Sequence, residues 1–380
     1  MNEHIESLQL LQDVMKIQSV NSQDDEGQLA EWICEYFNGY GIKAQVDRID
    51  LKHANVYAFI EGEEPSETVL WNGHLDTVPF GELDEWNTDP SIPVLTDAYI
   101  FGRGASDMKS GLCAMIYALC SSRYKGVRPR HSILFLGTCD EEKNGIGARE
   151  AQKLILEKKI NQIIIGEPTG LKIGVAQKGC LWLSVDVHGR TSHGAYPERG
   201  CSAVEHGYVV TQKLREYLAD FSHPLLGKST EVITKITGGV APNMMPDRCV
   251  FSMDIRFTPD ITSKQIIQKF NKIIQDEMLQ CGGMLSIRYS VCNQRSAIEV
   301  NESHPLLNQF VEILEEEKIK PEKIGIHFFT DGSIFTEANP NANILLFGPG
   351  EPSMAHRANE RLLIENYYKA IHVFQKMVRI

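Results

Sequence analysis

The sequence lacks an excess of positive charge. It has 38 Lys and Arg residues against 50 Asp and Glu residues, which gives a formal net charge of −12 at pH 7. Proteins that bind the phosphate backbone usually present a basic surface. We therefore expect no nucleic-acid partner.

Long apolar runs are also lacking. No stretch approaches the roughly 20 residues that a membrane-spanning helix needs, and residues 1–6 have neither the basic nor the apolar region of a signal peptide. The nine cysteines form no CxxC pair, and their odd number leaves one over in any complete set of disulfides. We expect a cytoplasmic protein without membrane attachment, in which most cysteines are buried free thiols.

The length of 380 residues exceeds what one ordinary compact core needs, so two domains, or one domain with a large insertion, are expected. The first part alternates strand and helix patterns, which indicates an α/β sheet covered on both faces. Expected strands lie at 43–49, 56–60, 68–72, 132–137 and 162–165, and expected helices lie around 8–15, 29–37, 109–121 and 146–158.

The pattern changes near Lys178. Residues 181–187 alternate apolar and polar side chains, which is typical of a sheet with one solvent-facing side. The elements expected next are a helix at 202–218, strands at 231–237 and 249–257, a helix at 262–281 and a strand at 285–292. This β-α-β-β-α-β order predicts a ferredoxin-like domain at 178–292.

The last part returns to mixed α/β patterns. The elements expected there are helices at 304–318 and 364–377 and strands at 324–329 and 343–347. The predicted fold class is therefore α/β, with a mixed-sheet domain formed by residues 1–177 and 293–380 and interrupted by the smaller domain.

A histidine and an aspartate, His74 and Asp76, follow the predicted strand at 68–72. Open α/β sheets bind ligands beyond the carboxyl ends of their strands. In an extended H-x-D segment the two side chains share a face, so Asp76 could accept the imidazole N–H and orient the ring of His74 for a metal. A lone histidine of this kind is more often structural.

The glycine-rich segment 101–111 carries one carboxylate, Asp107. A dinucleotide-binding fingerprint would need a glycine at this position, and a carboxylate would repel a pyrophosphate. A carboxylate at a strand-to-helix turn suits a metal bridge, although helix capping is the commoner role of such an aspartate.

Acidic residues also follow two further predicted strands. Asp140, Glu141 and Glu142 come after the strand at 132–137, and Glu167 comes after the strand at 162–165. A solvated charge run is the ordinary explanation for three consecutive carboxylates. An adjacent pair can also divide the roles of metal ligand and general base.

One more histidine, His356, lies in the glycine- and proline-rich loop 348–360. Together with the residues above it gives two imidazoles and three carboxylates. If two metal ions share one carboxylate, each ion has one imidazole and two carboxylates. Such ligands suit catalytic zinc, with cobalt or manganese as alternatives. The candidate ligands are His74, Asp107, Glu142, Glu167 and His356.

These segments resemble a known family, the cocatalytic metallohydrolases that include acetylornithine deacetylase, succinyl-diaminopimelate desuccinylase, aminoacylase and glutamate carboxypeptidase. The resemblance spans essentially the whole chain and rests on the ordered motifs GHLDTVP, GRGASDMKSG, TCDEE, GEPTG and AHRANE. It implies that His74 and Glu167 bind one metal ion, that Glu142 and His356 bind the other, that Asp107 bridges them, that Glu141 is the general base and that Asp76 is the partner of His74.

The resemblance also implies that the inserted domain, 178–292, is a lid and a homodimerisation domain. Within it, His193 matches a histidine that enters the neighbouring subunit's active site, Asn243 matches a residue that hydrogen-bonds substrate, and Arg256 matches a clamp for a substrate carboxylate. A surface role for His193 and a structural ion pair for Arg256 are the alternatives. Segment 329–333 resembles a substrate loop.

The predicted function is metal-dependent hydrolysis of a linear amide bond that removes an acetyl or succinyl type of N-acyl group from an amino acid. A dipeptidase or carboxypeptidase would use the same metal ligands and is the first alternative. A catalytically silent dimeric binding protein is the second. The presence of Glu141 argues against it, because a binding protein has no need of a general base.

Overall fold

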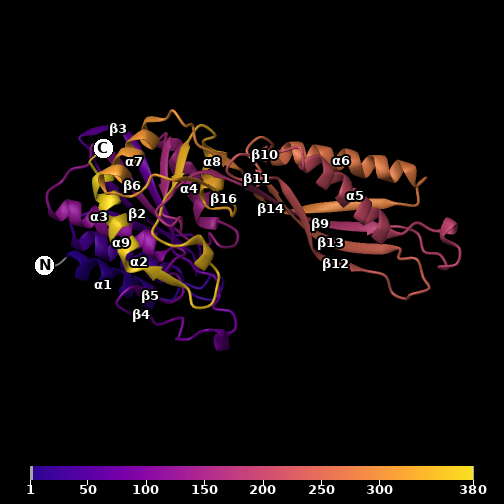
Figure 1. Ribbon diagram of the computed structural model, residues 1–380, viewed down its shortest axis with the longest axis horizontal. Coiled ribbons are helices and arrows are strands. Elements are labelled where there is room, and N and C mark those ends of the chain that lie inside the picture. The colour runs from indigo at the N-terminus through magenta and orange to yellow at the C-terminus, as the bar shows by residue number, and fades with distance from the viewer. Residues whose placement is uncertain (1–2, 380) are drawn as a thin grey trace. The chain divides into compact units, whose positions relative to one another are not determined.

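The structure, a computed structural model, describes residues 3–379. The chain folds as two compact units, and Figure 1 labels many of their helices and strands. The larger unit contains the described residues up to Val175, then Glu299–Ile324, and those from Thr330 onward. The smaller unit contains Ala176–Ile298 and Gly325–Phe329.

The larger unit is built on a nine-stranded mixed sheet with the order β1-β2-β6-β3-β7-β17-β8-β15, in which β16 also pairs with β8. Neighbouring strands β6, β3, β7 and β17 run parallel, whereas β1 and β2 are antiparallel. The strands are β1 (Ala44–Arg48), β2 (Ala54–Ile60), β3 (Glu64–His74), β6 (His131–Thr138), β7 (Gln162–Ile165), β8 (Ile173–Gln177), β15 (Ile298–Glu299), β16 (Lys323–Ile326) and β17 (Asn343–Leu346). The predicted α/β class with a mixed sheet is confirmed.

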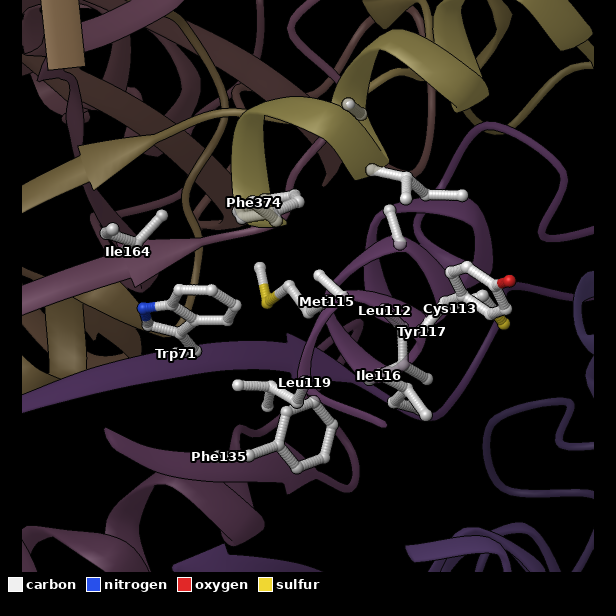
Figure 2. Packing of buried hydrophobic residues seen from close by; sticks show 14 of the residues in the cluster. Trp71, Leu112, Cys113, Met115, Ile116, Tyr117, Leu119, Phe135, Ile164 and Phe374 are labelled. Atoms are coloured by element: carbon white, nitrogen blue, oxygen red, sulfur yellow. The ribbon is translucent and has the colours of Figure 1, made fainter. Parts of the chain in front are cut away.

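Helix α3 (Lys109–Tyr124) lies at the centre of the main hydrophobic core. Its sequence is apolar on every side, as expected for a helix with no solvent-facing stripe, and its residues up to Ser122 are buried. Figure 2 shows Met115 of α3 between Trp71 of β3 and Phe374 of α9 (Ile364–Met377). The rings of Trp71 and Phe374 lie 5.2 Å apart.

Further helices of the larger unit pack on this core or on each other. Helices α1 (Glu3–Lys16), α2 (Gly27–Gly39) and α7 (Pro305–Glu316) contribute to the same cluster as α3 and α9. Helix α4 (Ile146–Glu157) packs against α8 (Gly332–Ala338). A small three-stranded sheet joins β4 (Val94–Leu95), β5 (Tyr99–Phe101) and β18 (Arg361–Leu363), and short 3₁₀ turns lie at η1 (Leu83–Glu85), η2 (Pro197–Arg199, in the smaller unit) and η3 (Pro352–Met354).

The smaller unit has an antiparallel sheet with the order β12-β13-β9-β14 and two long helices. Leu181, Leu183, Val185 and Val187 of β9 are buried and share a core with α5 and α6. The elements are β9 (Gly179–His188), α5 (Ala203–Leu218), β10 (Ser222–His223), β11 (Gly227–Lys228), β12 (Thr230–Gly238), β13 (Arg248–Phe257), α6 (Ser263–Gln280) and β14 (Ser286–Arg295). Apart from the short hairpin β10-β11, their order is β-α-β-β-α-β.

Side-chain caps explain where the two long helices begin. Ser202 accepts the N–H of Glu205 at the start of α5, and Thr262 forms a capping box with Gln265 at the start of α6. Within residues 3–379, no helix is both long enough and apolar enough to cross a membrane.

Candidate metal and catalytic site

Three neighbouring parallel strands of the larger unit end at the same edge of the sheet, and each delivers polar side chains there. His74 is the last residue of β3, Glu141 and Glu142 follow β6, and Glu167 follows β7. His74, Glu141 and Glu167 are almost completely buried, with 1%, 5% and 3% exposure. The predicted positions beyond the strand ends therefore converge at one edge.

Asp107 enters this cluster from the turn before α3. Helix α3 approaches the end of β7 very closely, because a Cβ added to Gly111 would lie 1.8 Å from the carbonyl oxygen of Gly166. Only glycine permits this approach. The close packing brings the turn that carries Asp107 toward the residue that follows Gly166, namely Glu167.

His356 comes from the loop between η3 and β18. Its backbone is in the left-handed region, with a φ of 61°. Non-glycine residues adopt this conformation rarely, and residues held in it cluster at functional sites.

Asp107 lies between the two imidazoles. One carboxylate oxygen, Oδ1, is 3.2 Å from Nε2 of His74, and the other, Oδ2, is 3.3 Å from Nε2 of His356. Nε2 of His356 is also 2.9 Å from Oε2 of Glu142. Ligand atoms of His74, Asp107 and Glu142 all lie within 4.8 Å of one another, so these three residues could hold a metal ion.

The carboxylates of the cluster crowd negative charge into a buried space. Burial, followed by the charge of Asp107, raises the pKa of Glu142 to about 7. Burial also raises the pKa of Glu167 well above its usual range, with further contributions from Asp107 and Glu142. Bound cations would relieve this repulsion, so the set of donors fits divalent metal ions.

The two imidazoles face the carboxylates of the same cluster. Burial alone would lower the pKa of His74, but its hydrogen bond to Asp107 and the nearby carboxylates hold that pKa well above its usual range. Hydrogen bonds to Asp107 and Glu142 raise the pKa of His356 to about 10. The surrounding carboxylates thus favour positive charge at these positions, which is the charge that bound metal ions would supply.

Glu141 differs from its neighbour Glu142. Burial raises the pKa of its carboxyl group well above the usual range. One of its oxygens, Oε1, is buried and has no hydrogen-bond partner within residues 3–379. A buried carboxylate with a free oxygen beside potential metal ligands is suited to move a proton.

Asp76 contacts His74 differently from the sequence expectation. Nδ1 of His74 lies 2.9 Å from the backbone oxygen of Asp76, whereas the carboxylate oxygen Oδ1 is 3.6 Å away. The carboxylate instead accepts the backbone N–H groups of Glu141 and Glu142, each at 3.1 Å, and the side-chain amide of Asn21 at 2.9 Å. Asp76 orients the imidazole through its carbonyl and the acidic pair through its carboxylate.

Glu360 supports the Asp107 turn and was not singled out from the sequence. Its buried carboxylate accepts the N–H groups of Ser106 and Asp107 at 2.8 and 2.9 Å and pairs with Arg103 at 2.7 Å. It belongs to the AHRANE segment that also carries His356, which is the one sequence signal that pointed to it.

Two further buried acidic side chains, Glu26 and Asp331, contact the segment around the acidic pair, and no sequence motif points to this role. Glu26 accepts the backbone N–H of Asp140 at 2.8 Å, and burial, followed by the charge of Asp76, raises its pKa to about 9. Asp331 accepts the hydroxyl of Thr138 at 2.6 Å, and its charge contributes to the raised pKa of Glu141. Asp331 falls in segment 329–333, which was expected to be a substrate loop.

The three predicted substrate-binding residues all belong to the smaller unit. His193 and Asn243 lie on adjoining loops, because the N–H of Gly194 donates to the carbonyl of Asn243 at 2.8 Å. Arg256 makes two hydrogen bonds to Asp254, at 2.8 and 3.1 Å. Arg256 therefore forms an ion pair with Asp254, as the structural alternative for this residue predicts.

The fold and these side chains define a metal-dependent hydrolase of the α/β class. Comparison with known families matches residues 70–380 to peptidase family M20/M25/M40. The chain belongs to this family. The predicted resemblance and the predicted enzyme class, a metal-dependent amidohydrolase or metallopeptidase, are confirmed.

Several relatives illustrate the match. A probable succinyl-diaminopimelate desuccinylase of Staphylococcus aureus (strain MSSA476) is 27% identical over 407 aligned positions, which cover 98% of this chain and 96% of the relative. A tripeptidase from Staphylococcus aureus has a similar structure, with a TM-score of 0.80, 20% identity, and coverage of 100% of this chain and 98% of that one. A dinuclear metal-binding peptidase from Bacillus subtilis gives a TM-score of 0.75 at 14% identity, with coverage of 99% and 97%.

Proposed function

We propose that this protein hydrolyses the amide bond of an N-acyl amino acid, with an acetyl or succinyl type of acyl group. The observation that carries the proposal is the position of Asp107, whose two carboxylate oxygens each face a different imidazole. A carboxylate so placed suits a bridge between two metal ions, and paired ions are suited to amide hydrolysis. The near full-length match to a relative named as a desuccinylase supports the acyl substrate.

In the proposed site, His74 and Glu167 would hold one ion, Glu142 and His356 would hold the other, and Asp107 would be shared by both. Nitrogen and oxygen ligands with open positions suit zinc, and cobalt or manganese would also fit. When bound, the ions lower the pKa of a water molecule and polarise the carbonyl of the substrate.

Glu141 is the proposed proton carrier. Its buried carboxylate accepts the proton of the attacking water and then donates it to the leaving nitrogen of the amide. The raised pKa and the oxygen without a partner within residues 3–379 both support this role. Asp76 holds the backbone of Glu141 through its carboxylate and thereby positions the base.

We also propose that the smaller unit is a lid and dimerisation domain. It corresponds to the domain that the sequence predicts at 178–292. His193 donates a hydrogen bond to the oxyanion, Asn243 hydrogen-bonds substrate, and Arg256 binds a substrate carboxylate with its guanidinium oriented by Asp254. β12 is an edge strand of its sheet and exposes Val232 and Ile236, with 55% and 56% exposure. Such an edge favours pairing with a second copy of the chain.

We further propose that the enzyme works in the cytoplasm. All nine cysteines are free thiols in the structure, and reduced cysteines are typical of that compartment.

A substrate panel tests the proposed function. Enzyme reconstituted with zinc, cobalt or manganese is expected to hydrolyse at least one N-acetyl or N-succinyl amino acid with a higher kcat/KM than any unmodified dipeptide or tripeptide. Release of free amine, measured for each compound, is the readout. Hydrolysis of unmodified peptides alone would establish the peptidase alternative, and no hydrolysis at all would favour the silent binding protein.

A second prediction concerns His193. Donors to a developing oxyanion matter most in the transition state, so His193→Ala is expected to lower kcat by about 10² to 10³ with metal content and fold unchanged. His188→Ala is the matched control, because His188 is another partly exposed histidine of the same unit, and it should retain activity.

Mixed dimers test whether His193 acts across an interface. A hybrid of inactive His193→Ala and inactive Glu141→Gln subunits contains one site with an intact base and an intact donated histidine, so part of the activity should return. Verified hybrids that stay as inactive as their parents, with both variants folded and metal-loaded, would show that the histidine does not act in trans.

A further inference from the structure

The smaller unit contains a second group of side chains with metal-ligand chemistry, separate from the site described above. Cys201 precedes α5, His206 lies in its first turn, and Cys281 follows the end of α6. The three residues offer ligand atoms that all lie within 4.8 Å of one another. The beginning of one helix and the end of another therefore meet at two thiols and an imidazole.

The three ligand atoms lie within reach of one ion. Sγ of Cys281 lies 3.5 Å from Nε2 and 3.6 Å from Nδ1 of His206. Zinc binds sulfur at about 2.3 Å and imidazole nitrogen at about 2.0 Å, so a tetrahedral angle places these two ligand atoms about 3.5 Å apart. The sulfur stands at this distance from Nε2, but it is almost equally far from Nδ1, so binding of one ion requires a rotation of the Cys281 or His206 side chain.

Glu277 of α6 orients the imidazole for this role. Its Oε1 lies 2.7 Å from Nδ1 of His206, and its Oε2 accepts from Nζ of Lys213 at 2.6 Å. A proton held on Nδ1 by this carboxylate leaves the lone pair of Nε2 free to bind a metal ion. A carboxylate behind a histidine in this way is the usual support of a metal-binding imidazole.

We propose that Cys201, Cys281 and Nε2 of His206 bind one zinc ion, with water as the fourth ligand. Two thiolates and an imidazole select a borderline-soft cation such as zinc over magnesium or calcium. Binding releases the two thiol protons to solvent. Both cysteines are buried, and the side chain of His206, with 27% exposure, leaves a path from solvent.

This ion would stabilise the base of a loop. Cys201 pairs with Arg190 through two backbone hydrogen bonds, at 2.8 and 2.9 Å, which close the loop that carries His193. Zinc at Cys201 would tie this base to the end of α6 through Cys281. None of the ligands of the proposed site belongs to the candidate catalytic cluster, so metal binding there can be measured separately from hydrolysis.

Cobalt titration of the full-length chain tests the proposal. Thiolate ligands give cobalt(II) a charge-transfer band in the near ultraviolet, whereas the nitrogen and oxygen ligands of the larger unit do not. Metal-free protein, kept reduced, is expected to develop this band to saturation at one ion per chain, and zinc should displace it. Cys281→Ser should remove the band, while Cys292→Ser, which alters an exposed cysteine of the same unit, should keep it.

A milder variant covers the case in which Cys281→Ser does not fold. Glu277→Gln keeps the size of the side chain but weakens the support of the imidazole, so the affinity for cobalt should fall by about 10- to 100-fold. Glu142→Ala, which alters only the larger unit, should leave the band intact, so this result is separable from any loss of hydrolysis. Absence of a thiolate band in the unmodified protein would overturn the proposal, as would a Cys201–Cys281 disulfide mapped by mass spectrometry in the protein as isolated.

Discussion

Removal of metal ions by a strong chelator is expected to abolish amide hydrolysis completely, and addition of zinc, cobalt or manganese should restore it. The proposed mechanism uses Glu141 as the base but no side chain as the nucleophile. Attack on the amide carbonyl therefore depends on a water molecule that the metal ions activate. Metal content, measured beside the initial rate during back-titration, should reach two ions in the larger unit at full activity.

The proposed zinc site of the smaller unit requires a control, because a chelator would remove its ion as well. The Cys281→Ser variant removes one of its thiols, so chelation and restoration in this variant report on the larger unit alone. Circular dichroism before and after chelation establishes that the chain remains folded. Full activity in demonstrably metal-free protein would refute a metal-dependent mechanism.

Replacement of Glu141 by glutamine should distinguish the role of a general base from the role of a metal ligand. Glu141→Gln is expected to retain two metal ions and lose about 10² to 10⁴ in kcat, because the amide cannot accept the proton of the attacking water. Metal analysis and kcat are measured on the same preparation. Glu150→Gln removes an exposed carboxylate of α4 and should leave both quantities unchanged.

Glu142→Ala is the informative comparison for the neighbouring position. Its carboxylate lies 2.9 Å from the imidazole of His356, so its loss should lower metal occupancy as well as activity. The opposite pattern, with metal lost in Glu141→Gln and retained in Glu142→Ala, would show that the roles of the two residues are exchanged.

The elements that position the candidate site could be predicted because they carry strong local patterns. Strands β6 and β7 each contain an apolar run, and an acidic residue stands two positions after the end of each strand, Asp140 after β6 and Glu167 after β7. Parallel strands deliver such residues to one edge of the sheet, so pairing β3 between β6 and β7 brings His74 to Glu142 and Glu167. Local sequence and topology lead to the same set of side chains.

The shortest elements could not be predicted because they contain too few residues to show the apolar repeat of a helix or a strand. β4 and β5 have two and three residues, and β18 has three. β8 is buried along its whole length and shows no alternation, and α8 has only seven residues. These elements depend on tertiary pairing, which a single sequence does not reveal.

The supporting contacts of the site were missed for a related reason. Glu360 binds the N–H groups of Ser106 and Asp107, which lie more than 250 positions away, and Glu26 binds the N–H of Asp140. Each of these carboxylates is unremarkable in its own segment. Nor could the sequence show that His74 would use the carbonyl of Asp76 rather than its carboxylate, because both belong to the same residue.

The strand order of the larger sheet has a consequence for synthesis of the chain. β17, at Asn343–Leu346, lies between β7 and β8, and α9 packs on α3 from the end of the sequence. Nearly all of the smaller unit is made before these parts leave the ribosome, so it can fold while translation continues. Until β17 arrives, β7 and β8 have open edges that could pair with other chains. The larger unit therefore depends on its last residues, and a chain that stops before β17 is expected to aggregate rather than to persist as a partly active enzyme.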